Sequence, residues 1–233
     1  MNKDIFIQHG IDITPNQLQL FDKYRNLILE YNKVMDITNI TDEEGMYIKH
    51  FLDSVLIKNS NINFNNVKLI DIGTGGGFPG IPLKIIYPSV NITLLDSLNK
   101  RVNFLNNVVK ELDLRDVETI HGRAEEFARK DSYREVYDIA VSRAVAQLST
   151  LIEYCLAYVK VGGYFISMKG PNYKEELKQA SNSLKVMGGK VTDIIEYSLP
   201  NNNGDRTIIV IKKICSTPKK YPRGQGKPRN MPL

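Results

Sequence analysis

The residues with the clearest chemical potential lie in the segment 71–80, where an apolar run ends in a carboxylate and continues as a glycine-rich turn. The glycines at alternate positions of this turn, Gly73, Gly75 and Gly77, tolerate positive φ and place no Cβ between the backbone and a ligand. Apolar segments flank the turn, so we predict a buried strand before it and a helix after it. Together these three parts form a cradle for a nucleotide-containing cofactor.

Two carboxylates near the turn indicate which cofactor the cradle holds. Asp71 stands directly before the glycines, where it would repel a pyrophosphate but attract the ammonium or sulfonium of S-adenosyl-L-methionine. Asp96 ends the next predicted strand, and an acid at that place accepts hydrogen bonds from a ribose diol. The glycines also satisfy the dinucleotide fingerprint, so NAD stays an alternative, as does a glycine turn without any ligand. The pair of acids favours S-adenosyl-L-methionine.

Strand-like and helix-like patterns alternate from residue 67 onward, which predicts an α/β protein with a mainly parallel sheet and helices on both faces. The last two strands are joined by a short turn with no room for a crossover helix, so they should form a C-terminal antiparallel hairpin. Seven strands with this hairpin are typical of the Rossmann-like class I methyltransferases that depend on S-adenosylmethionine, whereas simple NAD domains lack it. The predicted strands are 67–72, 90–95, 116–121, 136–142, 162–168, 190–198 and 206–213, and the predicted helices between them are 78–87, 99–112, 123–130, 147–159 and 173–187.

Two helices are predicted before the first strand. Residues 14–35 place apolar side chains at helical spacing behind a Thr-Pro cap, and a second helix runs from an N-cap at Thr41 to about residue 59. The second helix carries His50 and Asp53 three residues apart, on neighbouring parts of one face. A pair of this kind is more often structural than catalytic.

Length and composition fit a single core with appendages. With 233 residues and 42% hydrophobic content, the chain can bury one full core. It has no apolar run that could span a bilayer and no signal-peptide pattern, and Cys155 and Cys215 form no metal or redox pattern. We therefore expect a cytoplasmic monomer with no membrane partner and no metal.

The formal net charge of +5 is concentrated in the C-terminal tail. From Lys212 to the end there are seven basic residues and no acidic ones, so the rest of the chain is close to neutral. This distribution indicates a polyanionic partner that is held by the tail, with a solvated, disordered end as the alternative. We divide the chain into an N-terminal helical extension (1–66), an S-adenosylmethionine-binding methyltransferase domain (67–214) and a basic, proline-containing tail (215–233).

Ligands of open α/β sheets lie beyond the carboxyl ends of the strands, so the residues that follow each strand are the candidates for a site. Beyond the third strand, an alanine backbone and a glutamate side chain are placed to frame an adenine, although favourable acids at an ordinary helix start give the same pattern. The candidates beyond the second and third strands are Asp96, Ser97, Leu98, Arg123, Ala124 and Glu125.

Cations end the next two predicted strands, Arg143 the fourth and Lys169 the fifth, which is uncommon for packing alone. Enzymes that methylate an exocyclic amine commonly carry an Asn/Asp-Pro-Pro-aromatic tetrapeptide after the fourth strand, but here residues 142–145 read Ser-Arg-Ala-Val. No nearby cysteine offers a nucleophile for carbon methylation. An acceptor with a free lone pair, such as a purine ring nitrogen, needs neither device, and transfer then depends on positioning and electrostatics.

Taken together, these motifs resemble the glucose-inhibited division protein B family, the bacterial 16S ribosomal RNA guanine-N7 methyltransferases, also called small-subunit methyltransferase G. The resemblance covers nearly the whole chain, and the tail departs from it only where Gly224 and Gln225 follow Tyr-Pro-Arg. The segments that carry the resemblance are 49–54, 71–80, 96–98, 122–125, 142–144, 168–170, 221–223 and 232–233.

The resemblance implies a set of cofactor contacts and a reaction. A guanine would enter a pocket walled by Arg143 and Lys169, and its N7 would attack the methyl group with no general base, because N7 carries no proton. Arg143, Lys169 and Arg123 would orient this substrate. The target should be an unpaired or flipped guanine in 16S ribosomal RNA or the small ribosomal subunit, gripped by the tail and the N-terminal helices. The expected S-adenosyl-L-methionine contacts are Asp71, Gly73, Gly75, Phe78, Asp96, Ser97, Leu98, Ala124, Glu125 and Arg143.

Two other functions stay open at this point. The chain could methylate another RNA position or a small molecule, which the identity of the substrate and of the modified atom would reveal. It could also be a non-catalytic RNA-binding ribosome assembly factor that keeps S-adenosylmethionine as a structural ligand.

Overall fold

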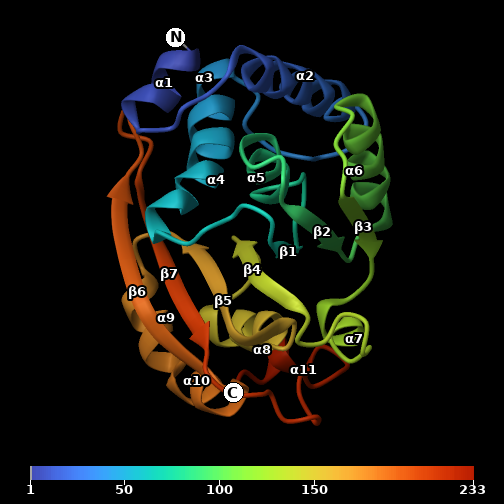
Figure 1. The fold of residues 1–233 in the computed structure, drawn as a ribbon, viewed down its shortest axis with the longest axis vertical. Coiled ribbons are helices and arrows are strands. Elements are labelled where there is room, and N and C mark those ends of the chain that lie inside the picture. Colours follow the sequence, from blue (N-terminus) through green and yellow to red (C-terminus); the bar gives the residue numbers. More distant parts are fainter. Residues whose placement is uncertain (1) are drawn as a thin grey trace.

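The computed structural model describes residues 2–233, and its centre is a seven-stranded sheet with the order β3-β2-β1-β4-β5-β7-β6 (Figure 1). β1 to β5 run parallel, and β7 lies antiparallel between β5 and β6. The predicted class I fold with its C-terminal hairpin is therefore confirmed. The strands are β1 (Lys68–Ile72), β2 (Asn91–Asp96), β3 (Val117–His121), β4 (Tyr137–Arg143), β5 (Val159–Lys169), β6 (Gly189–Ser198) and β7 (Asp205–Lys213).

Helices cover both faces of the sheet, as the alternation predicted. Neighbouring strand residues point to opposite faces, so Leu69 belongs to one hydrophobic cluster and Ile70 to the other. The helices after the strands are α5 (Gly80–Ile86), α6 (Asn99–Glu111), α7 (Ala124–Phe127), α8 (Leu148–Leu156), α9 (Tyr173–Gln179) and α10 (Ser181–Met187).

Several helices differ from their predicted lengths. The predicted helices 78–87 and 147–159 are shorter, Gly80–Ile86 and Leu148–Leu156, and β5 already begins at Val159. The predicted helix 173–187 is divided at Ala180, which has φ −82° and ψ 1° and whose amide donates to the carbonyls of both Glu176 and Leu177. The predicted helix 123–130 ends after four residues, at Phe127. The chain turns after Phe127, and beyond this turn Arg129 and Arg134 donate hydrogen bonds to carbonyls of the C-terminal tail.

The N-terminal helices form a layer over one face of the sheet. α1 (Asn2–Gln8) was not predicted, and α2 (Pro15–Tyr31) begins at the expected cap but ends four residues early. It ends there because the Asn32 side chain accepts hydrogen bonds from the backbone of residues 37 and 38.

The second predicted helix is a chain of short turns. It comprises α3 (Glu43–Gly45), a π-helical segment (Met46–Leu52), α4 (Asp53–Val55) and a 3₁₀ segment (Leu56–Ser60). The cap is Asp42, whose carboxylate accepts from the Gly45 amide at 2.7 Å, and not Thr41. π-helical turns often occur at functional sites, and this one carries His50.

The N-terminal layer is joined to the glycine turn by a buried tyrosine. Tyr24 of α2 is fully buried, and its hydroxyl donates to the Gly76 carbonyl. Its ring packs 5.6 Å from the rings of both Phe51 and Phe78. The helices therefore help to hold the turn in place.

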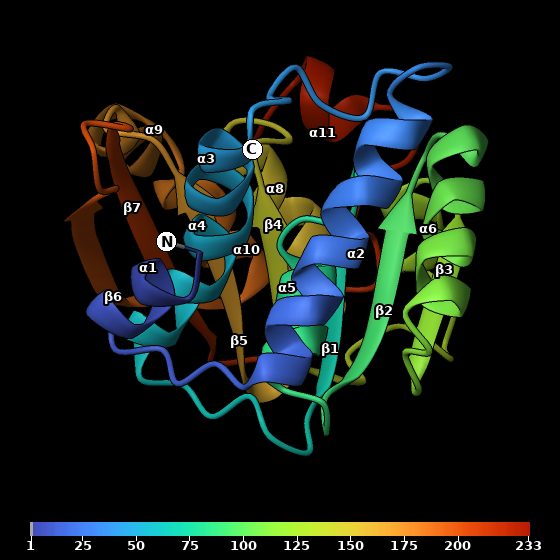
Figure 2. The same ribbon diagram turned by 90° about the horizontal axis from the view of Figure 1, so that it is seen from above.

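The C-terminal tail packs against the body of the protein. It contains the short helix α11 (Lys227–Asn230), which lies beyond the end of the sheet toward which β2 points (Figure 2). Within residues 2–233, no helix combines the length and the apolar character that a membrane span requires.

The Tyr24 hydrogen bond gives a stability prediction. Tyr24→Phe leaves the buried Gly76 carbonyl without this donor, so the free energy of unfolding should fall by about 1–2 kcal/mol. Urea denaturation measures the change, and Tyr31→Phe, on the same helix but half-buried, is the control. Equal stability of the wild type and Tyr24→Phe would contradict the assigned role.

Candidate active site

Three adjoining cavities lie at the carboxyl ends of the parallel strands. The outer cavity, lined by Leu98, Ala124 and Glu125, has a volume of about 510 Å³. The central cavity (about 370 Å³) is lined by the glycine turn and Asp96, and the basic cavity (about 680 Å³) by His50, Arg143 and Lys169. Val145, just after β4, lines all three. A ligand that extends through the outer and central cavities would therefore end beside the basic cavity.

The glycine turn leaves room for a ligand in the central cavity. Gly75 has φ +61°, and a Cβ added to it would meet only open space within 4 Å. Gly73 has φ +70°, and a Cβ there would come within 2.6 Å of Val145. The turn therefore combines a backbone conformation that favours glycine with a concave open side, which fits a nucleoside cofactor.

Asp71 acts inside the turn. It is fully buried, and its Oδ2 accepts hydrogen bonds from the Thr74 hydroxyl (2.7 Å) and the Gly80 amide (2.8 Å). Its Oδ1 has no hydrogen-bond partner among the described residues. Burial raises the pKa of Asp71 to about 7, against the lowering effect of the two donors. Its carboxyl group thus shapes the turn, and among residues 2–233 it is not part of the lining of the three cavities.

Asp96 has the position that a ribose-binding acid requires. It ends β2, is 2% exposed and lines the central cavity. Its Oδ2 accepts from the Gly75 amide and its Oδ1 from the Leu98 amide, both at 2.9 Å. Each carboxylate oxygen keeps a further lone pair that can accept from a ligand hydroxyl. Arg101, which the sequence analysis did not select, lies 3.6 Å from Asp96.

The outer cavity combines an apolar floor with polar edges. Leu98 is 43% exposed although it is apolar, and it lines this cavity together with Ser97. Glu125 is buried beside Ala124, whose carbonyl accepts a hydrogen bond from Tyr158 at 2.6 Å. A cavity of this composition fits a flat, largely apolar base with hydrogen-bonding edges.

A stack of three side chains separates the central cavity from the basic cavity. The His50 ring lies flat on Phe78, with 4.4 Å between ring centroids and 13° between planes. The Arg143 guanidinium lies over the same ring at 5.1 Å. The next residue, Ala144, has φ +56°, a strained conformation for a non-glycine residue that is frequent at functional sites.

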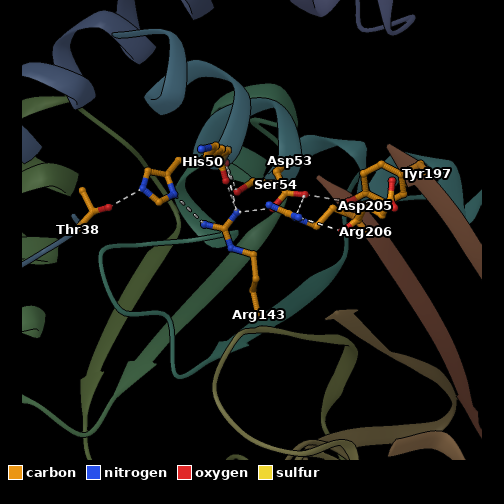
Figure 3. A network of polar contacts seen from close by, with 9 residues as sticks. Thr38, His50, Asp53, Ser54, Arg143, Tyr197, Asp205 and Arg206 are labelled. Atoms are coloured by element: carbon orange, nitrogen blue, oxygen red, sulfur yellow. Dashed lines mark hydrogen bonds and ion pairs between the residues drawn. The ribbon is translucent and has the colours of Figure 1, made fainter. Parts of the chain in front are cut away.

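The tautomer of His50 follows from its partners (Figure 3). Arg143 donates from Nη2 to Nδ1 at 3.4 Å, so the ring proton is on Nε2, which lies 2.7 Å from the Thr38 hydroxyl. Burial, followed by the charge of Arg143, lowers the pKa of His50 to about 3. The ring is therefore neutral at physiological pH and a poor proton acceptor.

Asp53 is the centre of the network in Figure 3. Its carboxylate is 3% exposed and accepts from Arg143 and from the Tyr197 hydroxyl, each at 3.0 Å. Arg206 of β7 lies 3.6 Å away. His50 and Asp53 thus belong to a buried network that holds Arg143. Their role is structural, and it positions a residue that lines the cavities.

The structure separates the cations that were predicted to orient a substrate. Arg143 and Lys169 line the basic cavity, while Arg123 is 62% exposed at the edge of the outer cavity. The Lys169 ammonium donates to the Ala146 carbonyl (2.6 Å) and to Glu176 (2.7 Å). Lys169 therefore holds the loop after β4.

Several residues that line the cavities carry no recognisable signal in the sequence. Val145 has an ordinary apolar side chain, and Arg101 lies on a helix, so neither type nor spacing marks them. The tail residues Gln225, Gly226, Arg229 and Asn230 also line the outer cavity. The net positive charge of the tail as a whole predicted an RNA contact, and it gave no sign that these residues lie at a cavity.

Solved structures with the same fold include two proteins with bound S-adenosyl-L-methionine. M. jannaschii TYW2 in complex with AdoMet is similar with a TM-score of 0.54 at 14% identity, over 77% of this chain and 81% of that one. Aeropyrum pernix fibrillarin with bound S-adenosyl-L-methionine gives 0.53 at 19% identity, over 69% and 73%. The strand order with its C-terminal antiparallel hairpin and these likenesses show the fold of the class I methyltransferases.

The family is shown by sequence. Residues 17–207 match the family described as rRNA small subunit methyltransferase G, GidB, and the chain belongs to that family. The Ribosomal RNA small subunit methyltransferase G of Lachnoclostridium phytofermentans is 52% identical over 96% of this chain and 93% of its own length. That of Alkaliphilus metalliredigens is 49% identical over 99% and 97%. The resemblance found in the sequence motifs is confirmed.

The raised pKa of Asp71 predicts a specific pH dependence of stability. In the folded protein the carboxyl has a pKa of about 7, against 3.8 when unfolded, so its contribution to stability is full below pH 3.8 and is lost as the pH rises through 7. Asp71→Asn carries no such charge. The unfolding free energy of this variant relative to wild type should therefore rise by about 2 kcal/mol between pH 5 and pH 9.

Urea denaturation at both pH values measures this difference. Asp131→Asn, which changes an exposed carboxylate, should follow the wild type at both pH values. A constant difference between wild type and Asp71→Asn across the pH range would contradict a pKa of about 7 for this buried carboxyl group.

Proposed function

We propose that the protein transfers a methyl group from S-adenosyl-L-methionine to N7 of a specific guanine in 16S ribosomal RNA. The observation that carries the proposal is the basic cavity, which meets the glycine-lined cavity at the Arg143–Val145 loop. This arrangement offers an acceptor site next to the end of a cofactor site. Family membership supplies the substrate class.

The cofactor would extend from the central cavity into the outer one. Gly73, Gly75 and Phe78, which line the central cavity, would hold its methionine part, and Asp96 with Ser97 would hold its ribose. When bound, the cofactor supplies a methyl group on a positively charged sulfur, which is an electrophile. Leu98, Ala124 and Glu125 would hold the adenine. Asp71 would act by holding the turn and by its negative potential, and Arg143 borders the methionine part.

The acceptor chemistry fits the basic cavity because N7 needs no base. His50 is neutral there, with a pKa of about 3 and its ring nitrogens engaged by Thr38 and Arg143. The N7 lone pair can attack directly, so catalysis comes from orientation and electrostatics. The π-stack of His50 and Phe78 is a rigid wall against which the guanine can be placed.

Arg143 is the residue we assign to substrate orientation. Its guanidinium is held by Asp53 at 3.0 Å, and it lines both the central and the basic cavity. Such a fork can donate to guanine O6 or to a neighbouring phosphate. Lys169 supports the loop beside it, and Arg123, at the edge of the outer cavity, would contact the RNA backbone.

The acceptor guanine must be accessible to this cavity. N7 lies in the deep, narrow major groove of A-form RNA, so the target should be unpaired or flipped out. We propose that the exposed Lys219 and Lys220 and the N-terminal helices contact the surrounding RNA. The substrate would be 16S ribosomal RNA or the small subunit, and the protein would act as a monomer in the cytoplasm.

The modified nucleoside tests the proposed reaction. Small-subunit ribosomal RNA from cells with and without the protein should differ by loss of one 7-methylguanosine, detected by digestion and mass spectrometry. Complementation with the wild type should restore it. A different methylated nucleoside would show another RNA position as target. An unchanged RNA, together with cofactor binding by the purified protein, would favour a non-catalytic assembly factor.

The role of Asp96 is tested by cofactor affinity. Asp96→Asn keeps the shape of the side chain but replaces a charged acceptor by a neutral amide, so the Kd for S-adenosylhomocysteine should rise at least about ten-fold. Isothermal titration calorimetry measures it, with the exposed Asp113→Asn as the control. Unchanged affinity would exclude Asp96 from the ribose site.

A further inference from the structure

The C-terminal tail borders the cavities of the site. Gln225, Gly226, Arg229 and Asn230 line the outer cavity, and Arg229 lines the central cavity as well. Figure 2 shows α11, which contains Arg229 and Asn230, beyond the end of the sheet toward which β2 points. The tail, whose positive charge predicted an RNA contact, thus forms a wall of the outer and central cavities.

A buried ion pair fastens the tail to α8. Glu153 is fully buried, and its carboxylate accepts from the backbone amide and the Nη2 of Arg223, both at 2.7 Å. A buried carboxylate with charged and backbone donors is specific in geometry and costly to leave unpaired. Five residues further along the tail, the Pro228 carbonyl accepts from Thr150 of α8 at 2.9 Å. Both sides of the 224–227 loop are therefore attached to the same helix.

Two arginines hold the preceding part of the tail. Arg129 donates to the Pro222 carbonyl through two nitrogens, at 2.8 and 3.0 Å. Arg134 donates to the carbonyls of Thr217 (2.8 Å) and Tyr221 (2.9 Å). The tail thus has a defined path along the body before it reaches the outer cavity.

The loop itself contacts a residue of the site. The Gly226 amide donates to Oε1 of Glu125 at 3.3 Å. Gln225 and Gly226 both have positive φ, +59° and +70°, and this conformation is unfavourable for glutamine. The rest of the tail must hold the loop in this conformation, which keeps its backbone against Glu125.

Arg229 adds a cation where the cavities meet. Among residues 2–233, the lining of the central cavity includes three arginines, Arg101, Arg143 and Arg229, and one acidic residue, Asp96. Arg229 also lines the outer cavity, together with Tyr154. The excess of positive charge suits an anionic group of the ligand.

We infer that the tail closes the cofactor site and that Arg229 binds the carboxylate of the methionine part of the cofactor. The inference rests on the proposed function, since it takes S-adenosylmethionine as the ligand. It assigns the tail to cofactor binding, and it leaves Lys219 and Lys220 for RNA. The tail, which follows the last strand β7, is then a part of the active site.

Calorimetric titration of the full-length protein tests the inference with two probes. Arg229→Ala should raise the Kd for S-adenosylhomocysteine about ten-fold through loss of a charge-assisted contact. It should leave the Kd for 5′-methylthioadenosine, which lacks the carboxylate, within about two-fold of the wild-type value. Lys227→Ala is the matched control, because this exposed lysine shares α11 and is not among the described residues that line the cavities.

Hydrogen exchange provides a second measurement on the unmodified protein. Saturating S-adenosylhomocysteine should slow exchange of the amides of residues 224–227, 229 and 230, because the closed loop has fewer openings. If the wild type binds S-adenosylhomocysteine normally, two results would overturn this inference but not the proposed function. These are the absence of protection of the loop amides, and an unchanged Kd of Arg229→Ala for S-adenosylhomocysteine. Equal losses for the two probes would overturn the carboxylate assignment. If the wild type bound neither S-adenosylhomocysteine nor 5′-methylthioadenosine, both the inference and the proposed function would be overturned.

Discussion

The buried carboxylate of Asp53 is the contact on which the arrangement of this site depends. It lies at the start of α4 and joins groups from three other parts of the chain: Arg143 at the end of β4, Tyr197 of β6 and Arg206 of β7. Each partner supplies a donor that the others cannot replace, because the carboxylate is almost inaccessible to water. Removing one partner from such a pair leaves an uncompensated charge and costs about 3–5 kcal/mol. The network therefore fixes the N-terminal layer against the sheet and Arg143 against the cavities at the same time.

This coupling explains how a common fold acquires a particular site. Many class I methyltransferases share the sheet, and the likeness to solved structures extends to proteins at 14% identity. What is added here comes from both ends of the chain. The N-terminal layer supplies His50, stacked on Phe78, and Tyr24, which holds the glycine turn. The C-terminal tail supplies the outer wall. The conserved geometry of the sheet thus serves as a scaffold for residues that lie outside it.

Electrostatics differ between the two sides of the glycine turn, and the difference matches the two tasks of the site. On the inner side, Asp71 is kept in a buried position where its pKa is about 7 and where its donors come from the turn itself. On the outer side, the cavities collect guanidinium and ammonium groups that are held by carboxylates. The first arrangement shapes a backbone, and the second one prepares a surface for an anionic partner.

The sequence alone determined the fold class, the glycine cradle and the residues at the strand ends. These features are written in local patterns: alternation of strands and helices, glycines at a turn, and acids or cations directly after a strand. The structure placed Asp96, Leu98, Glu125 and Arg143 along one row of cavities, as the strand ends predicted. Cap and helix boundaries were less accurate, because Thr41 and Asp42 are both good caps and only one of them faces the Gly45 amide.

Only the tertiary structure decided what those residues meet. Arg143 and Asp53 are 90 residues apart, and Glu125 and Gly226 are 101 residues apart, so no local pattern connects them. Lys169 reads as a free cation in the sequence, but in the fold its ammonium is bound by Ala146 and Glu176. The charge of the tail predicted a polyanion, while its packing placed it beside the cofactor cavities. Local sequence determines which side chains are available and which face is buried, whereas pairing between distant segments is determined by the packing of the whole chain.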